Sequence, residues 1–289
     1  MCGEQVPILG YPRSMGKNRL HTYVCSAVLG SALLLAGPAR AQVVAEPIDA
    51  AWLATDAKVV GLDFRFGRTD EEIFSVTSLI FEVFGHIPVT PEITVHGRLP
   101  FELTIPSGGG ESETLSGLGN IQLGARYSGV AGQLRFGAGV TVGLPTADDD
   151  GEGLLGSLIS SAFMAPIDLA RFGPNVTLLG FDGAFRFGEG RWFVQGDVDL
   201  DLMFVEDTDD TQLLYLRAAG GFLATDQLSL LLGLHNLFVL EDTDDNTFHA
   251  LAPGLVYETP AVRVAAHIYL PLDDFGDLWG FGVGVGAKF

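Results

Sequence analysis

Apolar and polar side chains alternate with a period of two along most of the chain, from about Val59 to the last residue. That period sends successive side chains to opposite faces of a β-strand. The clearest case is the C-terminal segment, where glycines alternate with Phe281, Val283, Val285 and Phe289. The pattern predicts twelve strands, at roughly residues 57–66, 73–88, 92–105, 118–128, 133–145, 174–187, 191–205, 211–224, 228–240, 247–258, 261–270 and 278–289.

The connections between these segments alternate between two kinds. Five are short turns, at residues 90–91, 128–132, 188–190, 225–227 and 259–260. Six are acidic loops, at residues 68–72, 106–117, 146–173, 206–210, 241–246 and 271–277. Antiparallel strands therefore place all the short turns at one end and all the acidic loops at the other. This arrangement is typical of bacterial outer-membrane barrels, which have short periplasmic turns and longer external loops.

One face of each predicted strand is apolar, and the other carries the charges. On the charged face, which we predict to line the lumen, seven acids and seven arginines are candidates for setting selectivity. They are Asp63, Glu82, Glu102, Asp182, Asp197, Asp199 and Asp201, with Arg65, Arg98, Arg126, Arg135, Arg186, Arg217 and Arg263. Alternation by itself fits a water-soluble barrel turned inside out equally well. The acidic loop end and the export signal described next favour a closed antiparallel transmembrane β-barrel, an all-β fold whose closure leaves no unpaired strand edge in lipid.

The start of the chain has the pattern of a secretory signal peptide. Lys17 and Arg19 precede the apolar stretch 23–37, and Ala39-Arg40-Ala41 offers small residues for cleavage. We therefore expect a signal peptide over residues 1–41 and a barrel over 42–289, in the bacterial outer membrane. Cys2 and Cys25 both lie in the expected signal peptide, which would leave the barrel without a thiol for disulfides or catalysis.

Composition excludes several other classes. The chain has 289 residues, 47% of them hydrophobic, and a formal charge of −20. That charge excludes binding along DNA or RNA, which needs a field of lysine and arginine. The hydrophobic content excludes a disordered chain. Apart from the apolar stretch near the start, the sequence has no run of about 18 apolar residues, so helical membrane spans are not predicted.

The candidate chemistry is electrostatic, and each feature has a simpler alternative. Asp197, Asp199 and Asp201 share one inward face, where they would attract cations or, as we expect, pair with Arg186 and Arg217 in a narrow lumen. In the loops, Asp148, Asp149, Asp150 and Glu152 are weak candidates for binding divalent cations such as Ca²⁺, and a solvated acidic rim is the simpler interpretation. No other metal site and no cofactor is predicted.

Catalysis is not predicted either. His86, His96, His235 and His267 fall on the inward side, but no Gly-x-Ser-x-Gly motif or triad spacing accompanies them.

Two features of the sequence interrupt the regular strand pattern. Residues 153–172 have partly helical spacing and form either a short helix in the barrel mouth or an extra hairpin that raises the strand count to fourteen. Pro253 lies within a predicted strand, where it removes one hydrogen-bond donor.

Three segments carry a resemblance to a known class. The C-terminal strand, with Phe281, Val283, Val285 and a final Phe289, resembles the signal that the barrel-assembly machinery of Gram-negative bacteria recognises. The segment from Gly117 to Tyr127 and the strand ending Val142-Gly143-Leu144-Pro145-Thr146 resemble transporters of the phenol-degradation meta-pathway type. That family usually has Asp where Asn120 stands and Gly where Ala147 stands. The resemblance implies passive passage of small or hydrophobic molecules, without catalytic residues.

Two functions from different classes remain. The first is a passive channel or transporter whose solute is unknown, with loop 146–173 as a lid. The alternative is a structural or surface-interaction barrel with a lumen sealed by salt bridges and with acidic loops that bind cations. Under both hypotheses the expected partners are outer-membrane lipid, lipopolysaccharide and the assembly machinery. A lipid-modifying enzyme is disfavoured because no triad is present.

Overall fold

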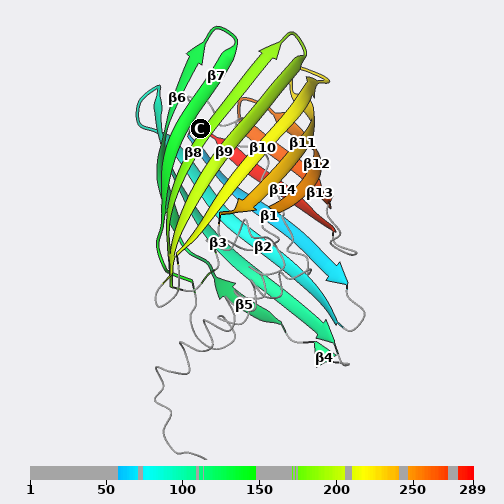
Figure 1. The fold of residues 1–289 in the computed structure, drawn as a ribbon. Coiled ribbons are helices and arrows are strands. Elements are labelled where there is room, and N and C mark those ends of the chain that lie inside the picture. Colours follow the sequence, from blue (N-terminus) through cyan, green and yellow to red (C-terminus); the bar gives the residue numbers. More distant parts are fainter. Residues whose placement is uncertain are drawn as a thin grey trace, which may run out of the picture.

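The computed structural model describes residues 58–70, 74–108, 111–112, 114–147, 171, 173, 175–205, 210–240, 247–272 and 279–289. The predicted signal peptide, most of segment 153–172 and the candidate cation ligands Asp148, Asp149, Asp150 and Glu152 lie outside these residues. Within them, the chain forms a barrel of antiparallel strands (Figure 1). No helix in the described ranges is long and apolar enough to cross a membrane.

Each strand pairs antiparallel with its neighbours, and β1 pairs with both β2 and β14, which closes the ring. The strands are β1 (Val59–Asp70), β2 (Phe74–Pro88), β3 (Ile93–Gly108), β4 (Glu111–Ser112), β5 (Leu115–Leu118), β6 (Gln122–Ala131), β7 (Leu134–Gly143), β8 (Val176–Glu189), β9 (Trp192–Val205), β10 (Thr211–Leu223), β11 (Leu228–Val239), β12 (Thr247–Glu258), β13 (Val262–Pro271) and β14 (Trp279–Lys288). The short β4 and β5 pair with β3, as β6 does, so these three segments together form one barrel strand. The prediction of a closed barrel of twelve strands is therefore confirmed.

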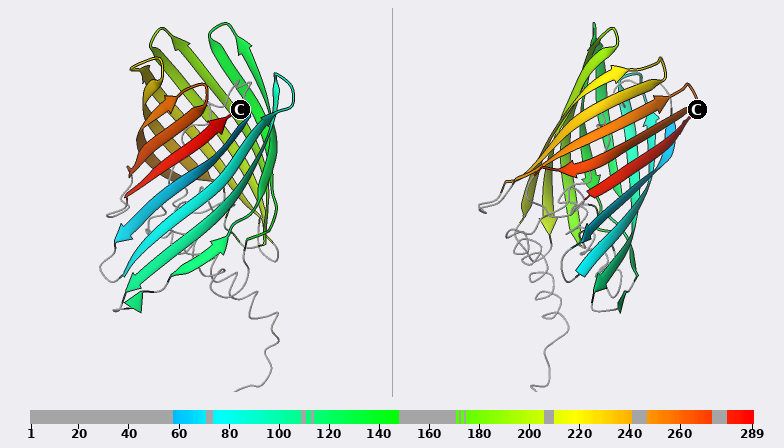
Figure 2. Two further views of the ribbon diagram at one scale, coloured as in Figure 1. Left: turned by 180° about the vertical axis from the view of Figure 1, so that it is seen from behind. Right: turned by 90° about the vertical axis from the view of Figure 1, so that its right-hand side faces the viewer.

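The hairpin turns gather at one end of the barrel, together with the C-terminus, as the upper part of Figure 1 shows. We call this the turn end and the opposite one the loop end. Gly132 and Gly190 occupy two of the turns with a φ of +62°, a conformation that glycine adopts without steric cost. The strands are tilted against the barrel axis on every side (Figure 2). Tilt is required to close a sheet of this kind into a barrel.

The two ends of the sheet join through β1 and β14. The backbone amide of Lys58 donates to the carbonyl of Phe289 at 3.2 Å, and the amide of Phe289 donates back at 3.0 Å. On the inner side, Asp63 lies opposite Gly284 and Arg65 lies opposite Gly282, so two charged side chains face residues without side chains. The inner glycines of β14 thus leave space for the ionic groups of β1.

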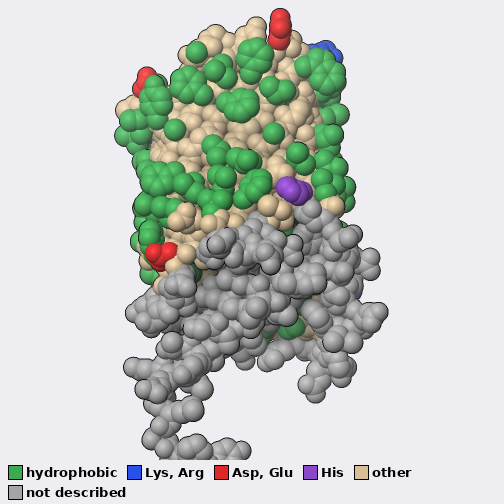
Figure 3. All heavy atoms as spheres, viewed as in Figure 1, with side chains coloured by type: hydrophobic (Ala, Val, Ile, Leu, Met, Phe, Trp, Pro, Cys, Tyr) green, Lys and Arg blue, Asp and Glu red, His purple; other side chains and the backbone are tan. Residues whose placement is uncertain are grey.

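The outer face is apolar and the inner face is polar. Outward-pointing Leu62 and Leu232 are 47% and 58% exposed, whereas Arg65 and Glu82 on the inner face are 0% and 2% exposed. Hydrophobic side chains cover the outer wall seen in Figure 3, with charged ones near its upper and lower margins. This distribution excludes the inverted, water-soluble barrel, because that molecule would expose its charges and bury its leucines.

Two local irregularities interrupt the strand ladders. Between the pairs Leu251–Leu270 and Gly254–His267, the β12–β13 ladder has no pair at Pro253, which lacks the amide hydrogen. The second irregularity follows β5, where Leu118 pairs with Phe101 but Gln122 pairs with Arg98. The strand of β5 and β6 therefore holds one residue more than β3 over this stretch, which is a β-bulge centred near Asn120.

Candidate functional site: the barrel lumen

The predicted lumen residues lie on the inner wall, but they do not form one site. Asp63, Arg65, Glu82, Glu102, Asp197, Arg217 and Arg263 are buried. Arg98, Arg126, Asp182, Arg186, Asp199 and Asp201 are partly buried, and Arg135 is exposed. They divide into ion-pair groups in the middle of the lumen and an arginine-rich region near the turn end. The two regions differ in chemistry, so we describe them separately.

Glu82 is the centre of the first ion-pair group. Its carboxylate lies 3.0 Å from Nη1 of Arg171 and 3.9 Å from both Nη2 of Arg65 and Nη1 of Arg98. Arg65 also donates from Nε to Oδ2 of Asp63 at 3.0 Å. We call these five residues the Glu82 cluster. Because buried charges are stable only when they are paired, the cluster fixes β1, β2 and β3 to Arg171, which belongs to the predicted lid.

The second group is built on β9, which presents its acids at every second residue. Antiparallel pairing sets Arg217 of β10 directly opposite Asp197. Its Nε donates to Oδ2 of Asp197 at 2.5 Å, and its Nη2 donates to Asp199. We call these three residues the Arg217 cluster. Nearby, Nε of Arg126 donates to Oδ2 of Asp182 at 2.8 Å.

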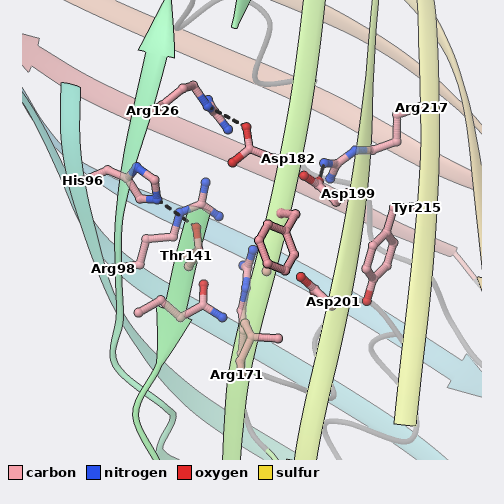
Figure 4. A pocket seen from close by; sticks show the side chains of 14 residues that line it. His96, Arg98, Arg126, Thr141, Arg171, Asp182, Asp199, Asp201, Tyr215 and Arg217 are labelled. Carbon is pink, nitrogen blue, oxygen red and sulfur yellow. Dashed lines mark hydrogen bonds and ion pairs between the residues drawn. The ribbon is translucent and has the colours of Figure 1, made fainter. Parts of the chain in front are cut away.

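A cavity of about 70 Å³ lies between these groups, and we call it the central cavity. Figure 4 shows side chains from opposite parts of the wall converging on it, including Arg98, Arg126, Asp182, Asp201 and Arg217. His96 and Thr141 are joined across the wall by a hydrogen bond of 3.1 Å between Nε2 and Oγ1. A space of this volume holds a few water molecules. The middle of the lumen is therefore narrow and lined by charges that neutralise one another.

Asn120 fixes both ends of the predicted lid to the wall. At the bulge, its fully buried Oδ1 accepts hydrogen bonds from the backbone amides of Thr146 and Ala147, each at 2.9 Å. Its Nδ2 donates to the carbonyl of Gly173 at 2.8 Å. Both ends of loop 146–173 are thereby held at one point of the barrel. We predicted neither this role nor the bulge from the sequence.

Arg171 is the second residue that the candidate set omitted. It is buried, and it reaches Glu82 from near the end of the acidic loop. The sequence does contain an indication of this role, since Arg171 is the only basic residue between Thr146 and Gly173. A single arginine in an acidic loop is a candidate for an ion pair with the carboxylates of the barrel wall.

A larger cavity of about 500 Å³ opens at the turn end, and we call it the vestibule. Arg135, Arg186 and Arg263 line it, with Gln195, Ser229 and the apolar Phe193, Leu231 and Val256 among the other wall residues. The guanidinium of Arg186 lies over the ring of Phe193, 3.9 Å from its centroid. We expected Arg186 to pair with the Asp197–Asp201 row. That expectation is wrong within the described residues, because Arg217 takes this position instead.

Part of the inner wall is apolar, which the alternation pattern did not predict. A buried patch runs along β8–β13 at the loop end and includes Leu178, Met203, Leu213, Phe248 and Tyr269. The expectation of a small or polar inner face is therefore wrong for these strand ends. Where water is excluded, apolar side chains stabilise an inner wall as they do a protein core.

The predicted histidines lie on the inner wall without forming a metal site. His86, His235 and His267 are buried, and His96 lines the central cavity. In the part of the chain that the structure describes, no three His, Cys, Asp or Glu residues are grouped closely enough to hold a metal ion.

Comparisons with known proteins identify solved structures with a similar fold. No family model and no curated protein sequence matches the chain. Among solved structures, a COG4313 outer membrane channel from Pseudomonas putida F1 is similar at a TM-score of 0.62 and 15% identity, over 85% of this chain and 100% of that one. The translocator domain of the autotransporter NalP from Neisseria meningitidis has a TM-score of 0.53 at 11% identity, over 93% and 99% of the two chains.

A third similar structure is the beta domain of the Bordetella autotransporter BrkA, with a TM-score of 0.50 and 11% identity over 81% of this chain and 100% of that domain. At such low identities the likeness concerns the fold alone. Together with the apolar outer wall, it confirms the prediction of an outer-membrane β-barrel.

Proposed function

We propose that this barrel is a passive channel of the outer membrane for small or hydrophobic solutes. The observation that carries the proposal is the presence of two separate spaces inside the barrel, the vestibule at the turn end and the central cavity in the middle of the lumen. Both spaces are lined by polar and charged groups, as in water-filled barrels, and in the middle they are constricted by ion pairs. The similarity to a solved outer membrane channel agrees with this function.

The lid is the second element of the proposal. Asn120 and the Glu82 cluster hold its ends at the wall, so we propose that the lid controls access from the loop end. The apolar patch on β8–β13 is buried, so it would stabilise the wall at that entrance. The passage of small or hydrophobic molecules is what the meta-pathway transporter resemblance implies.

Insertion and anchoring complete the proposal. Phe289 is highly exposed at the C-terminus, and Phe281 stacks with Phe66 on the outer wall. We propose that this strand is the signal for the barrel-assembly machinery, and that the apolar belt contacts lipid and lipopolysaccharide. The turn end would then face the periplasm, as in other outer-membrane barrels.

Planar-bilayer recording and liposome swelling with the purified, folded protein test the channel. We expect ion conductance and uptake of small solutes, and Arg217→Gln should change the conductance because it breaks the Arg217 cluster. Arg191→Gln is the matched control, since Arg191 is exposed at the β8–β9 turn and does not line either space. Folded protein with neither conductance nor swelling would contradict the proposal. If Ca²⁺ also stabilised that protein against heat, the sealed barrel with cation-binding loops would be favoured.

A further inference from the structure

We propose that the vestibule is a binding site for a small organic anion, one that carries a carboxylate on an apolar body. The inference rests on the proposed function and deepens it, because it gives the channel a solute class and a place where that solute binds. It follows from three features of the vestibule: the arrangement of its arginines, the position of its acids, and the shape of its wall.

The arginines of the vestibule face each other. Arg135 of β7 and Arg186 of β8 are direct cross-strand partners, an arrangement of like charges that normally destabilises a sheet. Within the described residues, neither has a carboxylate within ion-pair distance. By contrast, Arg65, Arg98, Arg126, Arg171 and Arg217 in the middle of the lumen all have one. A bound anion between Arg135 and Arg186 would relieve their repulsion.

The acids of the vestibule offset this pair only in part. Lys288 of β14 donates a hydrogen bond to the carboxylate of Glu258 on β12, and the charge of Glu258 acts on Arg186 without forming an ion pair with it. Asp226 lies exposed in the β10–β11 turn. Arg263, which lies on β13 opposite Glu258, adds a third guanidinium to the wall. The region therefore has a local excess of positive charge in a chain whose formal charge is −20.

The wall of the vestibule fits an anion that also has apolar surface. The guanidinium of Arg186 lies over the ring of Phe193, and this contact restrains its planar fork of N–H donors. Such a fixed fork suits bidentate binding of a carboxylate. Leu231 and Val256 offer apolar contact, and the buried Gln195 offers an amide. The volume of about 500 Å³ is in the range of small-molecule sites, which is about 300–1,000 Å³.

Isothermal titration of the full-length protein in detergent tests the site with three probes of similar size. Benzoate carries the anion, benzylammonium carries the opposite charge, and benzyl alcohol is neutral. We expect saturable binding of benzoate alone. In the double variant Arg135→Gln and Arg186→Gln, benzoate affinity should fall by about tenfold or more, because two charge-assisted contacts are lost. Arg191→Gln removes the same charge outside the vestibule and should leave the affinity unchanged.

Two results would overturn the inference: equal binding of all three probes, or unchanged benzoate affinity in the double variant. If the double variant does not fold, Arg135→Gln alone serves, since Arg135 is exposed and its replacement leaves the wall packing intact. The bilayer recording separates this inference from the proposed function. Conductance without benzoate binding would reject the anion site and keep the channel, whereas benzoate binding without conductance would keep the site and reject the channel.

Discussion

The middle of the lumen and the vestibule both contain arginines and acids, but they differ in how these charges are paired and in the volume of the space beside them. In the middle, five arginines form ion pairs with acids, and four of these arginines line a cavity of about 70 Å³. In the vestibule, Arg135 and Arg186 stand opposite each other beside a cavity of about 500 Å³. The difference shows that inward charge does not by itself make a pore. Paired charges fill the middle of the lumen, whereas the opposed arginines border a larger space.

Strand register produces this difference. In the middle, register sets Arg217 against Asp197, and Asp63 lies opposite Glu82 with Arg65 available to both. At the turn end, the register of β7 and β8 sets arginine against arginine. Substitutions that remove one charge should therefore lower the free energy of unfolding strongly in the middle of the lumen and little or not at all in the vestibule.

The largest effect is expected for Glu82→Gln in the middle of the lumen. This change leaves Arg65, Arg98 and Arg171 around a neutral amide, and breaking a buried ion pair typically costs about 3–5 kcal/mol. Guanidinium unfolding in lipid vesicles, followed by tryptophan fluorescence, measures the loss. Glu92→Gln is the control, because Glu92 is exposed in the β2–β3 turn, where its carboxylate accepts a hydrogen bond from the hydroxyl of Thr90. Equal stability of the two variants would show that the Glu82 cluster contributes nothing.

A smaller effect is expected for Asn120→Ala, which releases the ends of the lid. The change leaves buried partners at Thr146, Ala147 and Gly173 without their hydrogen bonds, at a cost of about 1–3 kcal/mol. Limited proteolysis should cut loop 146–173 faster, and the single-channel current should become noisier. Asn236→Ala removes an asparagine of the outer wall that donates to the carbonyl of Leu216, and it should affect neither measurement. A lid as protease-resistant as in the parent protein would argue against the anchoring role.

The smallest effect on stability is expected for Arg135→Gln in the vestibule. Removing one of two opposed like charges should leave the free energy of unfolding unchanged or raise it by up to about 1 kcal/mol. The same unfolding measurement in vesicles tests this. A loss comparable to that of Glu82→Gln would mean that Arg135 is compensated as the central arginines are, and the contrast between the two regions would fail.

Much of the fold could be predicted from the sequence because the two-residue period and the loop chemistry are local signals. The alternation in β14 and the short turns at Gly132 and Gly190 predicted strand positions within a few residues. The bulge at Asn120 could not be predicted in this way. It becomes visible only when the register of β3 against β5 and β6 is known.

The site was predicted less completely, for the same physical reason. The two-residue alternation placed Asp197, Asp199 and Arg217 on the inner face. Their pairing follows because β9 and β10 are adjacent strands joined by the acidic loop 206–210. The partners of Asn120 lie 26 to 53 residues further along the chain, and no local pattern joins them. Likewise, the opposition of Arg135 and Arg186 depends on strands joined by the long loop 146–173, which leaves their register unspecified.

The central claim is that the apolar face of each strand contacts lipid and the polar face lines the lumen. Two adjacent residues of β11 test it most directly, since Ser229 lines the vestibule and Leu230 is exposed on the outer wall. Each variant carries a single cysteine at one of these two positions, with Cys2 and Cys25 replaced by serine. In lipid vesicles, one measurement uses a membrane-impermeant maleimide and the other uses lipids that carry a nitroxide quencher. We predict that the maleimide labels the Ser229→Cys variant, whereas a fluorophore attached to the Leu230→Cys variant before reconstitution is quenched by the lipids. Labelling of Leu230→Cys together with lipid quenching at Ser229→Cys would contradict the account.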